Sequence, residues 1–489
     1  MSRIWPSAAQ AVKHARRTAQ APLHWDPPTH VLSRFTFGPT PSAHRYIAKH
    51  GIDAWYRAEL QAARECPGYQ GHAAVAAQGP LLSKTPAQTR AWLKAHGNEY
   101  DWNAMDQLTQ VTLGLQAWSR AQLFETLVDF FSNHLNVANH NGDVWTTRHG
   151  YDHDVIRRHA LGTFTDMLLA AARHPAMLLF LNLAESTKAA VNENYGRELL
   201  ELHTVGLVYS ESDVKNAARL LTGRTIDDDF NYRYDASNHP TGPVAVLGFR
   251  HDNASTSDGE SGGDALLRYL ARHPATASHL ARKLCVRFVS DTPSRALVAA
   301  VAKAYLEHGT AITPMITTIL HSQEFWDSRG RKVRRPTENL IATVRVLGTK
   351  VTDMGKALQT LHWMSAQMGN APLDWPAPNG YPDTAEDWRS SGTMLNLWEL
   401  HLGFADSWWD GFAKSDARHL YGHAPRTSGQ AVDALARRLT GMRFTATHRA
   451  VLQDFLDEPA RTPLSQSALR WQAAPLAAII LDGPHHALR

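Results

Sequence analysis

Residues 124–134 read Phe-Glu-Thr-Leu-Val-Asp-Phe-Phe-Ser-Asn-His, and the apolar side chains Phe124, Leu127 and Phe131 recur at spacings of three and four residues. This period places them on one face of an α-helix. Residues 195–202 repeat the pattern. Further helices are expected over 166–183, 265–289, 295–308 and 431–439. The sequence therefore predicts a mainly α-helical protein, built as one large helical body.

The segment 222–264 interrupts this helical pattern. It contains three successive aspartates, an alternation of Phe230, Tyr232 and Tyr234, and an end that is rich in Gly, Ser and Asp. Alternating apolar residues are typical of a short strand, and Gly and Ser clusters are typical of turns. We expect an irregular or β-hairpin insertion at 222–264 within the helical body.

No linker of distinct composition divides the chain. We expect an N-terminal extension over 1–27, a mostly helical core over 28–405, and a C-terminal helical segment over 406–489 that packs on the core. The pentapeptide Ala-Arg-His-Pro-Ala occurs at 172–176 and again at 271–275. Five residues are too few to predict a repeat architecture.

The composition excludes several classes of protein. The chain has 489 residues, with 50 Lys and Arg against 46 Asp and Glu and a net charge of +4, which does not favour bulk nucleic-acid binding. Its two cysteines, Cys66 and Cys285, exclude a disulfide framework and a thiolate zinc cluster. The chain is rich in histidine (27) and tryptophan (15). Histidine binds metals and tryptophan stacks on rings and sugars, so these residues indicate a protein that handles a ligand.

The sequence also bears on location and on common motifs. Its apolar stretches are too short to span a bilayer, and residues 1–25 lack the apolar core of a signal peptide, so we expect a cytoplasmic protein without membrane insertion. GxGxxG, P-loop, HExxH and CxxC patterns do not occur. The basic run 329–335 predicts a solvated surface turn, or alternatively a clamp for a phosphate or a carboxylate.

Residues 192–203 hold the most informative polar pattern. At about 100° per residue, one helix face about 100° wide collects the side chains of Asn194, Arg197, Glu198 and Glu201. One interpretation is a solvated i,i+4 chain of Glu193, Arg197 and Glu201. The other is a face turned into a cavity, in which Arg197 orients two catalytic carboxylates and Asn194 contacts the substrate.

A second group of polar residues lies on the first helix. Glu125, Asp129 and Asn133 share one face at i+4 steps, beside two phenylalanines that indicate burial. A buried carboxylate needs an arginine partner, a metal or a proton. His134 follows on the same helix as a candidate metal ligand, and a structural arginine partner is the alternative.

Histidines elsewhere offer weaker candidates. His149 and His153 have the i,i+4 spacing of metal ligands, but two ligands do not make a site, and capping or surface roles are the alternative. His251 and Asp252, after a strand-like run, form a candidate acid/base or ligand pair on a loop, although sequence neighbours rarely face each other.

These residues resemble a large bacterial family known as domain of unknown function 1800. The likeness covers roughly residues 28–405. The matching residues lie at 30–40, 125, 133–134, 136–137, 156–157, 159–162, 172–177, 192–206, 220–223, 251–252, 273–277, 283–284 and 376–381. The resemblance implies no settled activity, and it implies that members are commonly exported and are often encoded beside a sulfatase-like companion. Without an evident export signal, this chain departs from that pattern. Asp129, His149 and His153 also depart from it.

Three classes of function fit these residues. The first is a metal-assisted oxidoreductase acting on a small organic molecule in specialised metabolism, with Fe, Mn or Zn held by His134, Glu125 and Glu198. The second is a metal-free acid/base enzyme that acts on a glycosidic bond. The catalytic candidates are Arg197, Glu198, Glu201, Glu125, His251 and Asp252, and the substrate-binding candidates are Asn194, Trp145, Trp375 and Tyr381. The third is a binding or assembly protein whose polar faces are structural ion-pair networks. For the enzymes we expect a small-molecule or saccharide partner and no nucleic acid, and the sequence does not predict the oligomeric state.

Overall fold

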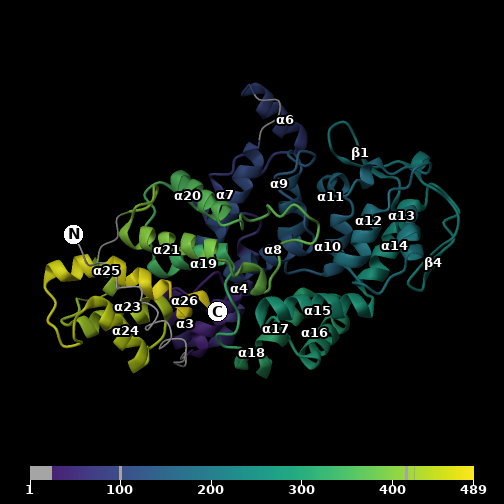
Figure 1. Cartoon of the computed structure of the whole chain (residues 1–489). Helices are drawn as coiled ribbons and strands as arrows, with labels where there is room; N and C mark the ends of the chain where they lie inside the picture. The colour runs from purple at the N-terminus through teal and green to yellow at the C-terminus, as the bar shows by residue number, and fades with distance from the viewer. Residues whose placement is uncertain (1–24, 98–101, 414–416, 423) are drawn as a thin grey trace.

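The computed structural model describes residues 25–97, 102–413, 417–422 and 424–489, so most of the predicted N-terminal extension lies outside the described residues. Helices dominate the described part of the chain, and its strands form two small two-stranded sheets. Figure 1 shows the helices that precede and follow the insertion at one end of the molecule and the C-terminal helices at the other end. The predicted mainly α fold with a short hairpin-bearing insertion is confirmed.

The first half of the chain supplies the central helices. Many of them begin at a capping side chain, as in α3, where Thr40 accepts a hydrogen bond from the Ala43 amide and Pro41 is the first helical residue. The elements are α2 (Pro27–Phe35), α3 (Pro41–His50), α4 (Ile52–Glu65), α5 (Ala73–Ala76), α6 (Pro86–Ala95), α7 (Asn103–Trp118), α8 (Gln122–His134), α9 (Arg148–Tyr151), the π-helix η1 (Asp152–Arg157), α10 (Phe164–Ala171), α11 (Pro175–Phe180), η2 (Leu183–Glu185), α12 (Asn194–Glu198), the π-helix η3 (Leu199–His203) and α13 (Glu211–Leu221).

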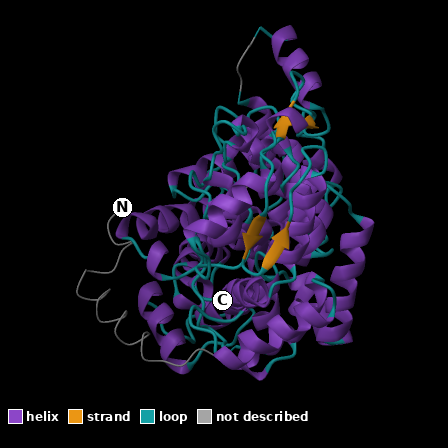
Figure 2. Cartoon of the chain, turned by 90° about the vertical axis from the view of Figure 1, so that its right-hand side faces the viewer, coloured by secondary structure: helices purple, strands orange, loops and turns teal. Residues whose placement is uncertain are grey.

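The insertion consists of two β-hairpins. Strands β1 (Arg224–Ile226) and β2 (Tyr232–Tyr234) pair antiparallel, as do β3 (Val244–Val246) and β4 (Phe249–His251), with the short helix η4 (Ala236–Asn238) between the hairpins. Figure 2 shows the strands in orange on the side of the molecule that faces the viewer. The helical chain resumes at Gly259, a few residues before the predicted boundary.

The second half returns to the central helices and ends in the C-terminal segment. Its elements are α14 (Gly259–Ala271), α15 (Pro274–Phe288), α16 (Arg295–Glu307), α17 (Ile312–Leu320), α18 (Gln323–Asp327), α19 (Pro336–Leu347), α20 (Met354–Gln367), η5 (Glu386–Trp388), α21 (Ser391–Asp406), α22 (Ala417–Tyr421), α23 (Ser428–Thr440), α24 (Ala446–Leu456), α25 (Gln466–Leu481) and α26 (Pro484–Ala487). Helix α25 packs along α21 and α23. None of the helices in the described ranges combines the length and the apolar character that a bilayer-spanning helix needs.

The repeated pentapeptide marks two helix boundaries. The two continuous helices predicted across it are wrong, because α10 and α11 are separate, as are α14 and α15. His174 and His273 are the N-caps of α11 and α15, and each accepts a hydrogen bond at 3.2 Å through Nδ1 from the backbone N–H of Ala176 or Ala275. The proline after each histidine is favoured at the first helical position, where its missing N–H costs nothing. The repeat is therefore a signal that ends one helix and starts another.

Buried charges join two of the three apolar cores in the described part of the chain. One core contains α8 and α15, the other contains α7, α19 and α21, and charged side chains from both sides meet between them. We call this group the central ion network; its members are Asp129, Arg287, Asp291, Lys332, Arg335, Glu338, Asp383 and Arg489. Arg335 and Arg287 both pair with Asp129, which confirms the structural-arginine alternative for that carboxylate.

The basic run 329–335 is not the solvated turn that the sequence predicts. Lys332, Arg334 and Arg335 are buried. Lys332 and Arg335 belong to the central ion network, while Arg334 donates to the carbonyl of His486 at 2.8 Å. Most of the run therefore binds acidic and carbonyl groups of the protein itself.

Candidate functional site

The polar face predicted over residues 192–203 is formed by α12 and η3, which are continuous. The switch to a π-helical turn is a feature that recurs at functional sites. Gly196 allows α13 to pack closely, because a Cβ there would lie 3.0 Å from the carbonyl oxygen of Val214 and 3.1 Å from Ala218 Cβ. With Tyr195 buried on the packed side, the polar side chains of the segment occupy the outer side.

The two carboxylates on this face have different surroundings. Burial raises the pKa of Glu198 above its ordinary value, and the neighbouring Glu201 raises it further, while Arg197 opposes both effects. Glu201 accepts a hydrogen bond from the Tyr209 hydroxyl. Arg197 donates two hydrogen bonds of 2.7 Å to Glu211. Its guanidinium is therefore committed to Glu211, and Glu198 has no ion-pair partner in the described part of the chain.

This arrangement matches neither the solvated i,i+4 chain nor the cavity-facing carboxylates that the sequence suggests. Arg197 does approach Glu193 at 3.9 Å, as the solvated i,i+4 chain requires, but the described residues contain no Arg197–Glu201 ion pair. Asn194 is exposed, whereas Glu198 and Glu201 are half-buried. The face is neither fully solvated nor enclosed in a cavity.

Four basic side chains, two of them buried and two half-buried, lie together near the end of η3. They are His134 on α8, His203 on η3, and His279 and Lys283 on α15. His134 Nε2 is 3.1 Å from the carbonyl oxygen of His203, and the rings of His134 and His279 have centroids 6.1 Å apart. Both ring nitrogens of buried His203 and one ring nitrogen on each of the other two histidines lack a hydrogen-bond partner among the described residues.

Burial makes the groups of this cluster weaker bases than usual. Burial, together with the charge of Lys283, lowers the pKa of His203 to about 3 and that of His279 to about 4. Burial also lowers the pKa of the Lys283 amine to about 8. The helical pattern places His203 off the polar face, and no local motif marks His279 or Lys283. Their proximity depends on how three distant helices pack, although Lys283 lies on one of the family-like stretches.

Glu125 has a structural partner. Its carboxylate accepts a 3.0 Å hydrogen bond from Arg157, and Arg157 also donates to Asp152 at 2.8 Å. Burial raises the pKa of Glu125, and Arg157 lowers it. Arg157 lines a cleft of about 560 Å³ together with Phe124 and His153. Glu125 therefore holds an arginine at the wall of that cleft rather than joining the Glu198 face.

The structure does not bring together the predicted metal ligands His134, Glu125 and Glu198. Glu125 and His134 lie nine residues apart on α8, about 13 Å along a helix axis. Glu125 is paired with Arg157, and one nitrogen of His134 faces the His203 carbonyl. Within the described residues, no three His, Cys, Asp or Glu side chains converge closely enough to hold a metal ion, so His149 and His153 have no third ligand either.

His251 and Asp252 do not form an acid/base dyad with each other. His251 ends strand β4, and its Nδ1 accepts a hydrogen bond from the Asn253 amide at 3.0 Å. Its ring packs against Gly262, while Asp252 is exposed to solvent. The pair therefore contributes to the turn after the second hairpin.

Two of the predicted aromatic platforms lie together, on the Pro-rich loop before η5. The rings of Trp375 and Tyr381 have centroids 5.1 Å apart, and those of Tyr381 and Trp388 are 5.8 Å apart. The end of α8 fixes this loop, because the side-chain oxygen of Asn133 accepts a 3.0 Å hydrogen bond from the Tyr381 amide. Trp145 is half-buried in the turn before α9, outside this row of rings.

We expect Gly380→Ala to lower the free energy of unfolding by about 2 kcal/mol. Gly380 has φ +69°, and a Cβ there would collide with the backbone of Asn133. Gly369→Ala is the matched control, since Gly369 has φ +66° but open space around its Cβ position. Urea unfolding of both variants separates collision from backbone strain. Equal losses of stability would show that the loop does not depend on close packing against α8.

The fold and the site define a mainly α-helical protein with two half-buried carboxylates in different surroundings and a partly buried cluster of three histidines and a lysine. Residues 30–488 match the family described as "Protein of unknown function (DUF1800)", and the chain belongs to this family. The match extends beyond the stretches recognised in the sequence and includes most of the C-terminal helical segment. No curated protein and no solved structure matches the chain.

Proposed function

We propose that the chain is an acid–base enzyme that acts on a glycosidic bond, with Glu198 as the proton donor and Glu201 as the second carboxylate. The observation that carries the proposal is the unequal environment of these two groups. Burial and Glu201 favour the protonated form of Glu198, whereas Glu201 accepts a hydrogen bond from Tyr209. Glycosidic cleavage requires two carboxyl groups in different roles, one of which is a proton donor with a raised pKa.

The role of Arg197 supports this assignment. An arginine free to pair with Glu198 would hold it ionised at neutral pH. Arg197 instead donates two hydrogen bonds of 2.7 Å to Glu211, and its charge lowers the pKa of Glu198 without outweighing burial and Glu201. Arg197 is then a positioning residue that fixes α12 against the start of α13.

Hydrolysis of glycosides by the full chain tests the proposal. A panel of 4-nitrophenyl glycosides identifies the sugar that the wild type accepts, and the methyl glycoside of that sugar is then given to Glu198→Gln and Glu201→Gln. Glu193→Gln is the control, because Glu193 lies one turn earlier and only approaches Arg197 at 3.9 Å. Release of free sugar that is lost in both variants and survives in the control supports the proposal. Full activity in Glu201→Gln, or no turnover of any glycoside by the wild type, would contradict it.

The metal-assisted oxidoreductase is the competing proposal, and it makes an opposite prediction about metal content. Because the carboxylate pair acts through proton transfer, we expect glycoside hydrolysis to persist after dialysis against a chelator. We also expect elemental analysis of the untagged protein to find no Fe, Mn or Zn near one equivalent per chain. A stoichiometric metal that is lost in Glu198→Gln or in His134→Ala would favour the metal-assisted reaction.

A further inference from the structure

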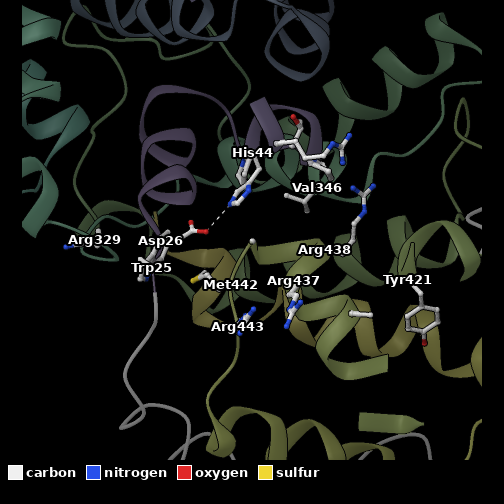
Figure 3. A pocket seen from close by; sticks show the side chains of 16 residues that line it. Trp25, Asp26, His44, Arg329, Val346, Tyr421, Arg437, Arg438, Met442 and Arg443 are labelled. Carbon is white, nitrogen blue, oxygen red and sulfur yellow. Dashed lines mark hydrogen bonds and ion pairs between the residues drawn. The ribbon is translucent and has the colours of Figure 1, made fainter. Parts of the chain in front are cut away.

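A cleft lined with arginines lies where the first helices meet the C-terminal segment. Its volume is about 880 Å³, within the range of small-molecule sites. Five arginines line it: Arg45, Arg329, Arg437, Arg438 and Arg443. Figure 3 shows Arg437, Arg438 and Arg443 on the C-terminal helical segment, with Asp26 and His44 coming from the first helices.

Acidic side chains of the described residues do not neutralise the positive charge of this cleft. In the part of the chain that the structure describes, none of the five arginines forms an ion pair with a carboxylate. Asp26 is the one acidic residue in the lining. Its carboxylate accepts a hydrogen bond from the Thr29 amide at 2.8 Å and lies 3.0 Å from His44 Nε2, so it does not pair with the arginines. Residues 1–24, which precede it, include no Asp or Glu.

Helix dipoles account for only part of this gathering of charge. Arg437 and Arg438 lie in the last turn of α23, where cations are favoured. Arg45 lies within α3, Arg329 follows the end of α18 and Arg443 follows the end of α23, so the five arginines converge from three separate parts of the chain. Like charges gathered in one cleft repel each other, and a bound anion removes that cost.

The cleft also holds hydrogen-bonding groups without partners. Trp25 Nε1, Arg438 Nε and the Tyr421 hydroxyl are buried and form no hydrogen bond in the described part of the chain. Each of these groups can donate a hydrogen bond. Arg438 is partly engaged, because its Nη2 donates to the Leu347 carbonyl at 3.2 Å. The lining therefore offers an excess of donors over acceptors, and its complement is a ligand rich in acceptor oxygens.

We propose that this cleft binds a small molecule that carries a diphosphate or two neighbouring phosphate groups. Guanidinium forks match phosphate oxygens bidentately, and five of them around one cleft match a ligand with several negative charges. A diphosphate presents acceptor oxygens in many directions, whereas a carboxylate presents two in one plane. The remaining volume and the rings of Trp25 and Tyr421 leave room for an organic group attached to the phosphates.

Isothermal titration of the full chain with inorganic pyrophosphate tests the proposal. We expect saturable binding by the wild type and at least tenfold weaker binding by the double variant Arg437→Gln/Arg443→Gln, since each charge-assisted hydrogen bond contributes substantially to affinity. Arg250→Gln is the matched control, because Arg250 is an exposed arginine on strand β4, outside the cleft. This control is expected to bind pyrophosphate within about twofold of the wild type, because the one positive charge that it loses lies outside the cleft.

A second variant and a second anion test the site and the class of ligand separately. If the double variant unfolds, Arg45→Gln takes its place, since Arg45 is exposed on α3 and has no ion pair among the described residues. Citrate is titrated in parallel as a multivalent carboxylate. Tighter binding of citrate than of pyrophosphate would overturn the phosphate assignment. Absence of pyrophosphate binding, or equal binding by the double variant and by Arg250→Gln, would overturn the site itself.

Discussion

Replacing Glu338 by Gln is expected to lower the free energy of unfolding by about 3–5 kcal/mol, because it removes one partner from a buried ion network. Glu338 pairs with Arg287, with Arg489 at 3.0 Å and with Arg335 at 3.3 Å, and its side chain is 4% exposed. The substitution keeps the shape of the side chain but leaves three buried guanidinium groups around a neutral amide. The measurement is the urea unfolding midpoint at pH 7.

The pH dependence of stability provides a second test of the same network. Burial raises the pKa of Glu338, but Arg287, Arg489 and Arg335 outweigh burial and hold its pKa well below the ordinary 4.5. A carboxyl whose folded pKa is lowered contributes its full stability above the unfolded pKa, and this contribution is lost as the pH falls towards the folded pKa. The stability difference between wild type and Glu338→Gln should therefore be constant near neutrality and shrink below about pH 4.5.

Glu307→Gln is the matched control for this prediction. Glu307 forms an i,i+4 pair with Lys303 at 3.7 Å, and its side chain is 57% exposed. Exposed pairs of this kind contribute about 0.5 kcal/mol or less. If Glu338→Gln destabilised the protein no more than this control, the central ion network would not hold the two cores together.

The fold class follows from the sequence because helical periodicity is a local property. Phe124, Leu127 and Phe131 are close in sequence, and their common face depends only on the helix itself. The same local reasoning fails at the His-Pro pairs, where the apolar period continues across 172–176 and 271–275 although the helix does not. There the capping histidine and the proline outweigh periodicity.

The partners of the buried charges cannot be predicted from the sequence. Asp129 and Arg335 are separated by 206 positions, and no local pattern relates a carboxylate on α8 to a basic run before α19. Because the acidic partners are distant in sequence, local reasoning predicts a solvated surface turn at that run, and this prediction is wrong. A dense basic run beside a proline can instead supply partners for buried acids, and only the packing of helices decides between the two.

The helix face that carries Glu198 and Glu201 has one feature that the sequence predicts and one that it does not. The sequence places Glu198 and Glu201 on a common face because their spacing is local. The partner of Arg197 cannot be predicted in this way, because Glu211 lies 14 residues away in the next helix. The surroundings that raise the pKa of Glu198, burial above all, are likewise a property of the tertiary structure.

Replacing Glu198 by Gln is expected to reduce hydrolysis of alkyl glycosides by about 10²- to 10⁴-fold, the usual contribution of a general acid. The loss should be far smaller for 4-nitrophenyl glycosides, because nitrophenolate leaves without a proton. Glu201→Gln should impair both substrates, since the second carboxylate acts at the sugar rather than at the leaving group. The measurement is kcat/KM for each variant with both kinds of leaving group.

The pH profile distinguishes this role from a structural one. Because burial and Glu201 raise the pKa of Glu198, the wild-type enzyme should keep its proton donor to a higher pH than an ordinary glutamic acid would allow, and its activity should fall as Glu198 ionises. Glu198→Gln cannot ionise, so its residual activity should lack this alkaline limb. Glu193→Gln should keep the limb, because Glu193 is not part of the pair. An unchanged alkaline limb in Glu198→Gln, or equal losses with both leaving groups, would remove Glu198 as the acid and leave it a structural role on α12.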